Sequence, residues 1–354
     1  MKLLMITRKV DENDSSPAGF TYNWVKKIGE KLEKLYVITW QKSDRGNLPN
    51  NIEIISLPDN KFYKIFILQF KLLKILPKVN GVFCHQNPEY TILSALMSKI
   101  FRKKIISWYA HGSVNWRRRL LERLTNKIIT VSDKSFRNPL FPKKVKIVGH
   151  GIDVYYFMPD KQDKEINDKF KIISIGRISP TKDYETLIEA IEILIKEKNV
   201  RNLEVKIIGG PVLKKEQKYF NNLKNIIKDK DLENYIKLLG PVSHNQILSY
   251  YQDCDLFINM SHTGSVDKAI LEAMACEKLV LTSNEAFEYI LKNDKLMFEQ
   301  LNQQDLAQKI INLMNLLKEN KEEIIKRLRN EVIENHNLDK LVKKILTIYA
   351  KYKI

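Results

Sequence analysis

The sequence of 354 residues contains few cysteines and no long apolar run, and each absence excludes a class of protein. The cysteines Cys84, Cys254 and Cys276 are odd in number and far apart, which argues against a disulfide framework and for a reducing, cytoplasmic compartment. No two of them have metal-ligand spacing. An uncharged apolar stretch of about 18 residues is missing, so the sequence predicts no transmembrane helix. The apolar run within residues 1–8 is too short for a signal peptide, and we interpret it as a buried strand.

Acidic residues are scarce in the first part of the chain. Residues 1–150 hold 28 Lys and Arg but only 11 Asp and Glu, a net charge of +17. Residues 151–354 hold 32 Lys and Arg and 31 Asp and Glu, a net charge of +1. Such an uneven distribution predicts that the basic half faces an anionic partner. An anionic membrane surface, a nucleic acid and a phosphate-bearing substrate all fit this description.

Strand-like apolar runs alternate with helical periods along the chain. In the first half we expect strands at Lys2–Ile6, Tyr36–Thr39, Ile52–Ser56, Gly81–His85, Lys104–Tyr109 and Lys127–Val131, and helices at Gly19–Leu35, Lys61–Leu76, Tyr90–Phe101 and Trp116–Leu124. After a polar stretch, Val154–Lys169, which we interpret as a linker, the alternation restarts at Lys171–Ile175 and continues to Leu279–Leu281. Alternating βα units predict parallel sheets covered by helices on both faces.

This pattern predicts an α/β protein of two doubly wound, Rossmann-like domains. We expect an N-terminal domain at residues 1–158, a second domain at 165–335, and a last helix, residues 337–354, that returns to pack on the first domain. Because open α/β sheets bind ligands at the carboxyl ends of their strands, we expect the ligand sites to face a cleft between the domains.

Two short segments carry most of the chemical information. The first, Ile173–Asp183, is an apolar strand that breaks at Gly176 and presents Arg177 and Lys182 before a helical stretch. A strand-to-helix turn that bears two cations suits a diphosphate, and a helix N-terminus adds backbone N–H donors. Taken alone, the two cations would also fit ordinary solvated charge on a loop.

The second segment, Gly264–Ala275, opens a helix with a turn of small residues and places Glu272 on its second turn. A carboxylate suits the hydroxyl groups of a ribose, and its small apolar neighbours suggest that it is buried and needs partners. The alternative is a carboxylate favoured by the helix dipole. Together the two segments predict a site for a sugar nucleotide.

At this point the chain resembles a known family, the retaining glycosyltransferases of GT-B fold called family four or group 1. The matching motifs come in the family's order: Ser15–Gly19, Tyr109–Gly112, Val131-Ser132, His150–Asp153, Gly176-Arg177 with Lys182, Ile208–Pro211, Leu239–Val242 and Leu271–Ala275. Each motif alone is weakly specific, and their order and spacing make the resemblance strong. It covers nearly the whole chain and is strongest over residues 145–285.

The resemblance implies roles for individual residues. Arg177 and Lys182 would bind the donor diphosphate and stabilise its growing charge without a metal, Glu272 would bind the ribose, and His111 would approach the donor sugar. Backbone near Gly240–Val242 would read the base. We expect His111, Arg177 and Lys182 to be catalytic, and the donor-binding set to be Gly19, Gly176, Arg177, Lys182, Gly209, Val242, Gly264, Ser265, Val266, Asp267, Lys268 and Glu272.

One position departs from the family. The family usually carries a second glutamate eight residues before Glu272, where this chain has Gly264. Asp267 offers an alternative acceptor for sugar hydroxyls, and Lys268 offers a third cation near the phosphates. The departure leaves open a non-catalytic relative that binds a nucleotide sugar without transferring it.

Other polar residues have two interpretations. A lone histidine such as His111 is often structural, and His150 fits a cap or hinge as well as a site; we expect His85, His244, His262 and His336 to be structural. The Asp253-Cys254-Asp255 motif resembles a metal-binding Asp-x-Asp, but it precedes an apolar strand instead of following one, so we interpret it as a turn and expect no metal.

Two basic segments, Lys61–Lys78 and Asn115–Lys127, mix cations with aromatic and aliphatic residues. Such helices bind anionic membrane surfaces, or they simply carry lysines on the outer face of a core-facing helix. With the resemblance, these features predict a metal-independent, retaining transferase that uses a UDP- or GDP-linked sugar, needs no further cofactor, and glycosylates a glycan or lipid-linked acceptor in cell-envelope synthesis.

Three alternatives remain. A sugar-nucleotide epimerase of the same fold would need acid and base carboxylates that the sequence does not place. A nucleic-acid-binding protein would use the basic half, but no RNA-binding aromatic motif supports it, and we expect no nucleic acid partner. A non-catalytic nucleotide-sugar-binding protein is suggested by Gly264.

Overall fold

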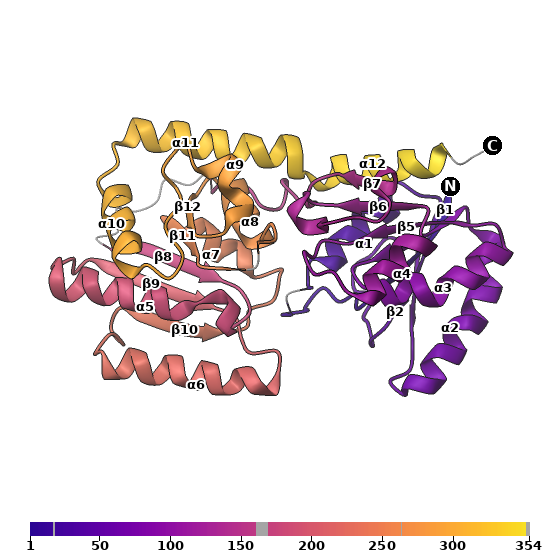
Figure 1. Cartoon of the computed structure of the whole chain (residues 1–354), viewed down its shortest axis with the longest axis horizontal. Helices are drawn as coiled ribbons and strands as arrows, with labels where there is room; N and C mark the ends of the chain where they lie inside the picture. The colour runs from indigo at the N-terminus through magenta and orange to yellow at the C-terminus, as the bar shows by residue number, and fades with distance from the viewer. Residues whose placement is uncertain (17, 161–168, 263, 352–354) are drawn as a thin grey trace. The chain divides into compact units, whose positions relative to one another are not determined.

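The computed structural model describes residues 1–16, 18–160, 169–262 and 264–351. The chain divides into two compact units (Figure 1): Met1–Asp14, Ala18–Asp153 and Asn335–Ile354 form the first, and Ser15–Pro17 and Val154–Glu334 form the second. Most of the expected linker, residues 161–168, lies outside the described residues. Within the described part of the chain, no helix combines the length and apolarity needed to span a bilayer.

The first unit is built on a parallel sheet of seven strands in the order β3-β2-β1-β4-β5-β6-β7. The strands are β1 (Lys2–Thr7), β2 (Lys34–Thr39), β3 (Ile52–Ser56), β4 (Gly81–His85), β5 (Lys104–Trp108), β6 (Lys127–Thr130) and β7 (Val145–Ile147). The helices are α1 (Thr21–Glu30), α2 (Lys61–Ile75), α3 (Pro88–Ile100), α4 (Trp116–Leu124) and α12 (Leu338–Ala350). The order reverses between β1 and β4, which is the doubly wound topology.

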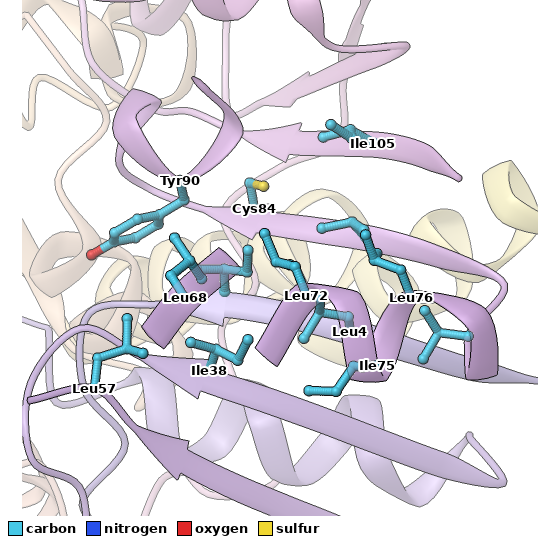
Figure 2. Packing of buried hydrophobic residues seen from close by; sticks show 13 residues of the cluster. Leu4, Ile38, Leu57, Leu68, Leu72, Ile75, Leu76, Cys84, Tyr90 and Ile105 are labelled. Atoms are coloured by element: carbon cyan, nitrogen blue, oxygen red, sulfur yellow. The ribbon is translucent and has the colours of Figure 1, made fainter. Parts of the chain in front are cut away.

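Apolar side chains from α2 and the sheet form one of the cores of this unit. Leu68, Leu72 and Ile75 of α2 lie against Leu4 of β1 and Ile38 of β2 (Figure 2). These helix positions recur at intervals of four and three residues, so they share one face of α2. Burial of that face fixes the helix on the sheet.

The last helix, α12, packs on this same unit, where its face of Leu341, Ile345 and Ile348 is buried. The hydroxyl of Tyr349 donates a hydrogen bond to the carbonyl oxygen of Val82 in β4.

The second unit has a parallel sheet of five strands in the order β10-β9-β8-β11-β12. The strands are β8 (Phe170–Ile175), β9 (Leu203–Ile208), β10 (Ile236–Gly240), β11 (Leu256–Asn259) and β12 (Leu279–Thr282). The helices are α5 (Tyr184–Glu192), α6 (Lys214–Asp229), α7 (Ile247–Asp253), α8 (Lys268–Ala275), α9 (Glu288–Leu291), α10 (Gln303–Met314) and α11 (Lys318–Glu331). Its order reverses between β8 and β11, so the predicted class of two doubly wound α/β domains is confirmed.

Some predicted element bounds were wrong. The helix expected to extend to Leu35 ends at Glu30, and Lys34 and Leu35 already belong to β2, where they pair with β1. The sequence analysis also missed β7, a short strand of partly and fully exposed residues that pairs with β6. In both cases hydrogen bonding to a neighbouring strand, rather than the local pattern, decided the structure.

Candidate functional site

Three glycines stand at the carboxyl ends of three adjacent strands in the second unit. Gly176 follows β8, Gly209 follows β9, and Gly240 ends β10. Gly209 has a φ of +142°, and a Cβ at this residue would lie 1.8 Å from the carbonyl oxygen of Gly176. Its N–H donates to the carbonyl oxygen of Gly240 at 2.8 Å. The three strand ends therefore meet backbone to backbone, which only glycine permits at position 209.

Arg177 leaves the end of β8 and is held by a carboxylate from the first turn of α6. Its Nε–H donates to Oε2 of Glu216 at 2.9 Å, and a second donor, on Nη2, bonds Oε1. Glu216 is only 3% exposed and also accepts the backbone N–H groups of Val212 and Leu213. Burial would raise the pKa of the Glu216 carboxyl, but these bonds outweigh burial and hold the pKa below its ordinary value. A guanidinium has five N–H donors, so Arg177 keeps donors for an anion.

Lys182 is paired with Asp267, the residue that caps α8. The same carboxylate oxygen accepts a hydrogen bond from Nδ2 of Asn259 at 3.0 Å. A Cβ at Gly176 would lie 3.7 Å from Cε of Lys182, so the lysine chain passes beside the end of β8. Burial would raise the pKa of Asp267, but the charge of Lys182 overrides burial and lowers the pKa.

His262 ties the same two loops together at a second point. The backbone N–H of His262 donates to the carbonyl oxygen of Thr181 at 3.2 Å, and its ring Nε2 lies 3.1 Å from Oδ2 of Asp183. Asp183 adopts a left-handed conformation with a φ of +48° just before α5. The two segments that the sequence analysis paired, Ile173–Asp183 and Gly264–Ala275, are thus in contact in the structure.

Glu272 lies on the second turn of α8 and is 5% exposed. Its Oε2 accepts the hydroxyl of Tyr251 at 2.9 Å, and its Oε1 lies 3.2 Å from Nε2 of His244 and 3.6 Å from Nζ of Lys268. Burial alone would raise the pKa of Glu272, but the bond with His244 and the charge of Lys268 together lower the pKa. Burial beside the Glu272 charge in turn raises the pKa of Tyr251 well above its ordinary value.

The remaining predicted residues of the second unit lie in the same loops. Gly264 has a φ of +60°, Ser265 accepts a hydrogen bond from Nδ2 of Asn284 through its carbonyl oxygen, and Val266 is buried. Val242 is half-buried in the loop that follows β10. That loop also carries His244, so the contact of His244 with Glu272 joins the β10 end to α8.

Two predicted residues, His111 and Gly19, belong to the first unit. His111 is exposed just beyond the end of β5, with its ring edge-on to Tyr109 at a centroid distance of 5.4 Å. Gly19 is buried in the turn before α1. The structure thus brings together the predicted donor residues of the second unit, while the convergence of His111 and Gly19 with them stays a prediction.

Sequence analysis missed Glu216, Tyr251 and Asn259 as site residues and expected His244 to be merely structural. Asn259 ends a buried strand, a position that often carries a polar site residue, and Glu216 stands three residues after Leu213 at the start of a helix, as in a capping box. Neither position indicates which residue the side chain contacts, because the contacting residues come from other elements of the chain.

The Asp253-Cys254-Asp255 motif lies between α7 and the amino end of β11, the opposite edge of the sheet from the loops described above. Oδ1 of Asp253 lies 2.6 Å from Nζ of Lys171, and Oδ2 of Asp255 accepts the backbone N–H of Lys171. Over the described ranges, no group of three or more His, Cys, Asp and Glu side chains is arranged to hold a metal ion.

Comparison with known proteins relates the second unit to a family of transferases. Residues 158–331 match the family model "Glycosyl transferases group 1". The chain is 27% identical over 151 residues to a D-inositol 3-phosphate glycosyltransferase of Kineococcus radiotolerans, covering 40% of this chain and 34% of that protein. It is 23% identical over 321 residues to an uncharacterised glycosyltransferase of Methanocaldococcus jannaschii, covering 82% of this chain and 74% of that protein.

Solved structures agree with this result over the whole fold. A glycosyltransferase from Rickettsia africae superposes with a TM-score of 0.78 at 21% identity, covering 99% of this chain and 98% of that one. Anabaena HepE, solved in complex with UDP, gives a TM-score of 0.78 at 17% identity, covering 99% and 100% of the two chains. Residues 158–331 thus resemble the group 1 glycosyl transferases, as the motifs of the chain predict, and the fold is that of the GT-B enzymes.

Proposed function

We propose that this protein transfers a sugar from a UDP- or GDP-linked donor to a glycan or lipid-linked acceptor, with retention of configuration and without a metal. The acceptor would belong to cell-envelope polysaccharide or glycolipid synthesis at the cytoplasmic face of the membrane. The observation that carries the proposal is the pair of cations at the end of β8, where Glu216 holds Arg177 and Asp267 holds Lys182. The match of residues 158–331 to the group 1 family model supports it.

The two cations suit the charge that develops in the reaction. As the glycosidic bond breaks, negative charge accumulates on the departing diphosphate, and fixed cations stabilise that charge without reorganisation. Glu216 and Asp267 fix the directions of Arg177 and Lys182 before the donor arrives. The departing phosphate oxygen then assists deprotonation of the acceptor on the same face of the sugar, which retains the configuration. We expect transfer to persist in the presence of a chelator.

Glu272 would bind the ribose of the donor. Its two oxygens already contact His244 and Tyr251, and a carboxylate offers about four acceptor positions, so capacity for hydroxyl groups remains. Its lowered pKa keeps it an acceptor at neutral pH. UDP is the first nucleotide to test, because HepE, a structural neighbour of the same fold, was solved with UDP and with UDP-glucose.

Thermal shift against UDP, GDP, ADP and their sugars tests the donor assignment. A ligand that binds the folded state raises the melting temperature by mass action. We expect one nucleotide to shift the wild type and to lose its effect in Arg177→Ala and Glu272→Ala. The matched control is Arg201→Ala, which removes an exposed side chain of the same unit whose Nε donates to Oδ1 of Asn199, and this variant keeps the shift. Absence of a shift with every nucleotide contradicts the proposal.

In the first unit, His111 would approach the donor sugar and the acceptor. Its exposed position beyond the carboxyl end of β5 supports this role, since ligands bind at such strand ends. We expect His111→Ala to lower kcat for transfer while leaving the thermal shift by the nucleotide unchanged. A loss of nucleotide binding in His111→Ala would contradict a role confined to the sugar and the acceptor.

A second candidate function is nucleotide-sugar binding without transfer, and Gly264 favours it. This residue occupies the position where the family usually has a glutamate, and its φ of +60° is one that a glutamate rarely adopts. A protein that binds the donor in the thermal-shift assay, yet neither transfers its sugar to any acceptor nor hydrolyses it, would support this candidate over the enzyme.

A further inference from the structure

Helix α2 carries apolar residues on two opposite sides. One side, with Leu68, Leu72 and Ile75, is buried in the core (Figure 2). The other side carries Phe62, Phe66, Phe70 and Leu73, which are all exposed, with Phe62 at 89% and Phe66 at 67%. These four positions also recur at intervals of four and three residues, and the two stripes are offset by two residues, or about 200° around a helix. The core therefore explains only one of the two apolar stripes.

The neighbouring helix α3 extends this surface. Leu96 and Ile100, one helical turn apart, are 67% and 61% exposed. The two helices are in contact, and Nε2 of Gln69 in α2 donates to the carbonyl oxygen of Leu93 in α3 at 2.9 Å. We call the six exposed apolar residues Phe62, Phe66, Phe70, Leu73, Leu96 and Ile100 the outer face. Exposed apolar residues grouped in this way indicate an interaction surface, whereas single ones carry no such meaning.

The charged residues around the outer face are almost all basic. Residues 61–104 contain nine Lys and Arg and one acidic residue, Glu89, which is paired with Arg117 at 2.7 Å. Lys61 and Lys78 are exposed and Lys71 is half-buried, and within the described residues none of these three forms an ion pair. An apolar strip bordered by free ammonium groups complements a surface that is apolar inside and anionic outside, which describes an acidic phospholipid bilayer.

The second basic segment, on α4, is different because three of its four arginines form ion pairs within the first unit. Arg118 and Glu122 are both fully buried and lie 3.2 Å apart, and Arg119 also contacts Glu122 at 3.1 Å. Arg117 is paired with Glu89 on α3. The charges of α4 therefore stabilise the first unit, and they do not make α4 the main contact for an anionic surface. The structure thus separates two segments that look alike in sequence.

We propose that the outer face of α2 and α3 docks onto an anionic phospholipid bilayer. Phe62, Phe66 and their apolar neighbours enter the interfacial region of the bilayer, and the bordering lysines contact the lipid headgroups. The inference deepens the proposed function and rests on it in one respect, since docking matters to catalysis only where the acceptor is lipid-linked. Binding to the bilayer itself does not depend on the donor site.

Flotation of the full chain with vesicles tests this proposal. The vesicles contain phosphatidylcholine alone or with about one third phosphatidylglycerol. We expect the wild type to float with the anionic vesicles, more weakly at high salt, and to bind phosphatidylcholine poorly. The double variant Phe62→Ser with Phe66→Ser removes exposed side chains and should fold normally. Its partition should fall about tenfold or more, because two aromatic anchors are lost. The charge variant Lys71→Glu with Lys78→Glu should bind less at low salt.

A matched control removes apolar residues elsewhere. Leu301→Ser with Leu317→Ser removes two side chains of the second unit that are 66% and 70% exposed, and this variant should float like the wild type. The proposal is overturned if the wild type ignores anionic vesicles, or if the phenylalanine variant floats as well as the wild type. It is also overturned if light scattering shows a dimer that the phenylalanine variant dissociates while vesicle binding is unchanged.

The thermal shift by UDP, GDP and ADP, measured on the same preparations, separates this proposal from the proposed function. Vesicle binding without any nucleotide shift would refute the donor site alone. A nucleotide shift without vesicle binding would refute the docking surface alone. The phenylalanine variant should keep the nucleotide shift of the wild type, because Phe62 and Phe66 belong to the first unit and the donor residues to the second.

Discussion

The guanidinium of Arg177 and the carboxylate of Glu216 form a two-point ion pair at the end of β8, and Glu216 is almost excluded from solvent. The pair joins the loop after β8 to the start of α6, which follows the next strand, β9. A buried carboxylate is tolerated only with such partners, so the pair has a structural consequence as well as the proposed role in orienting Arg177.

Replacing Glu216 with alanine should therefore destabilise the second unit by about 2–3 kcal/mol, because Arg177 and two backbone N–H groups lose their acceptor. Glu216→Gln keeps a side-chain oxygen that can accept the backbone N–H groups, so it should lower the free energy of unfolding by less. Urea unfolding measures both. Glu233→Ala, an exposed carboxylate of the same unit, is the control and should change little. Equal stability of Glu216→Ala and the wild type would show that the pair contributes nothing.

A pair of glycine variants tests the close packing of the strand ends. Gly209→Ala would place a Cβ 1.8 Å from the carbonyl oxygen of Gly176, so the β9 loop must move, and we expect a loss of at least about 3 kcal/mol or failure to fold. Gly240→Ala also sits at a positive φ, +78°, but its Cβ would meet nothing within 4 Å. Gly240→Ala should lower the free energy of unfolding by only about 1 kcal/mol. Circular dichroism melts compare the two, and similar melting temperatures would contradict the contact.

His336 should make the first unit sensitive to mild acid. This side chain is 3% exposed, its Nδ1 accepts the backbone N–H of His150 at 3.1 Å, and burial together with the charge of Lys344 lowers its pKa from 6.5 to about 4. Below pH 6.5 His336 is protonated in the unfolded chain, but in the folded chain it stays neutral until about pH 4. The free energy of unfolding therefore falls as the pH falls through this window. The full loss is about 3 kcal/mol, at about 1.4 kcal/mol per pH unit.

Chemical denaturation of the wild type and His336→Gln between pH 7 and pH 4 measures this effect. Glutamine cannot titrate, so the variant should have the shallower dependence of stability on pH, even if it is less stable at pH 7. Parallel pH profiles for the two proteins would show that His336 titrates normally in the folded state.

Lys182 should contribute to donor affinity more than to stability. Its Asp267 partner retains two other bonds, from Nδ2 of Asn259 and from the N–H of Ala269, so loss of the lysine leaves that carboxylate partly satisfied. We expect Lys182→Ala to weaken binding of the nucleotide diphosphate about tenfold, as expected for one lost bond between a cation and a phosphate. Calorimetric titration measures it, with Lys228→Ala, an exposed lysine of α6, as control. An unchanged affinity would remove Lys182 from the site.

Much of the fold could be predicted from the sequence, since buried parallel strands and amphipathic helices leave strong periodic signals. Lys61–Ile75 and Trp116–Leu124 were expected as helices at or within one residue of these bounds. The strand β7 could not be predicted, because the alternation of Val145, Lys146 and Ile147 is too short to distinguish a strand from a loop and its residues are partly or fully exposed. Pairing with β6, which lies earlier in the chain, decides its structure.

The sequence by itself determined the two-domain α/β class and the two segments that form the candidate site, because strand periodicity, glycine turns and the spacing of cations are local properties. Only the tertiary structure decided which groups meet: Glu216 with Arg177, His244 with Glu272, and Asp267 with Lys182. It also decided that Arg117, Arg118 and Arg119 of α4 form ion pairs while the phenylalanines of α2 stay exposed. The physical reason is that ion pairing and burial depend on residues that are distant in the chain, and no local pattern names the partner.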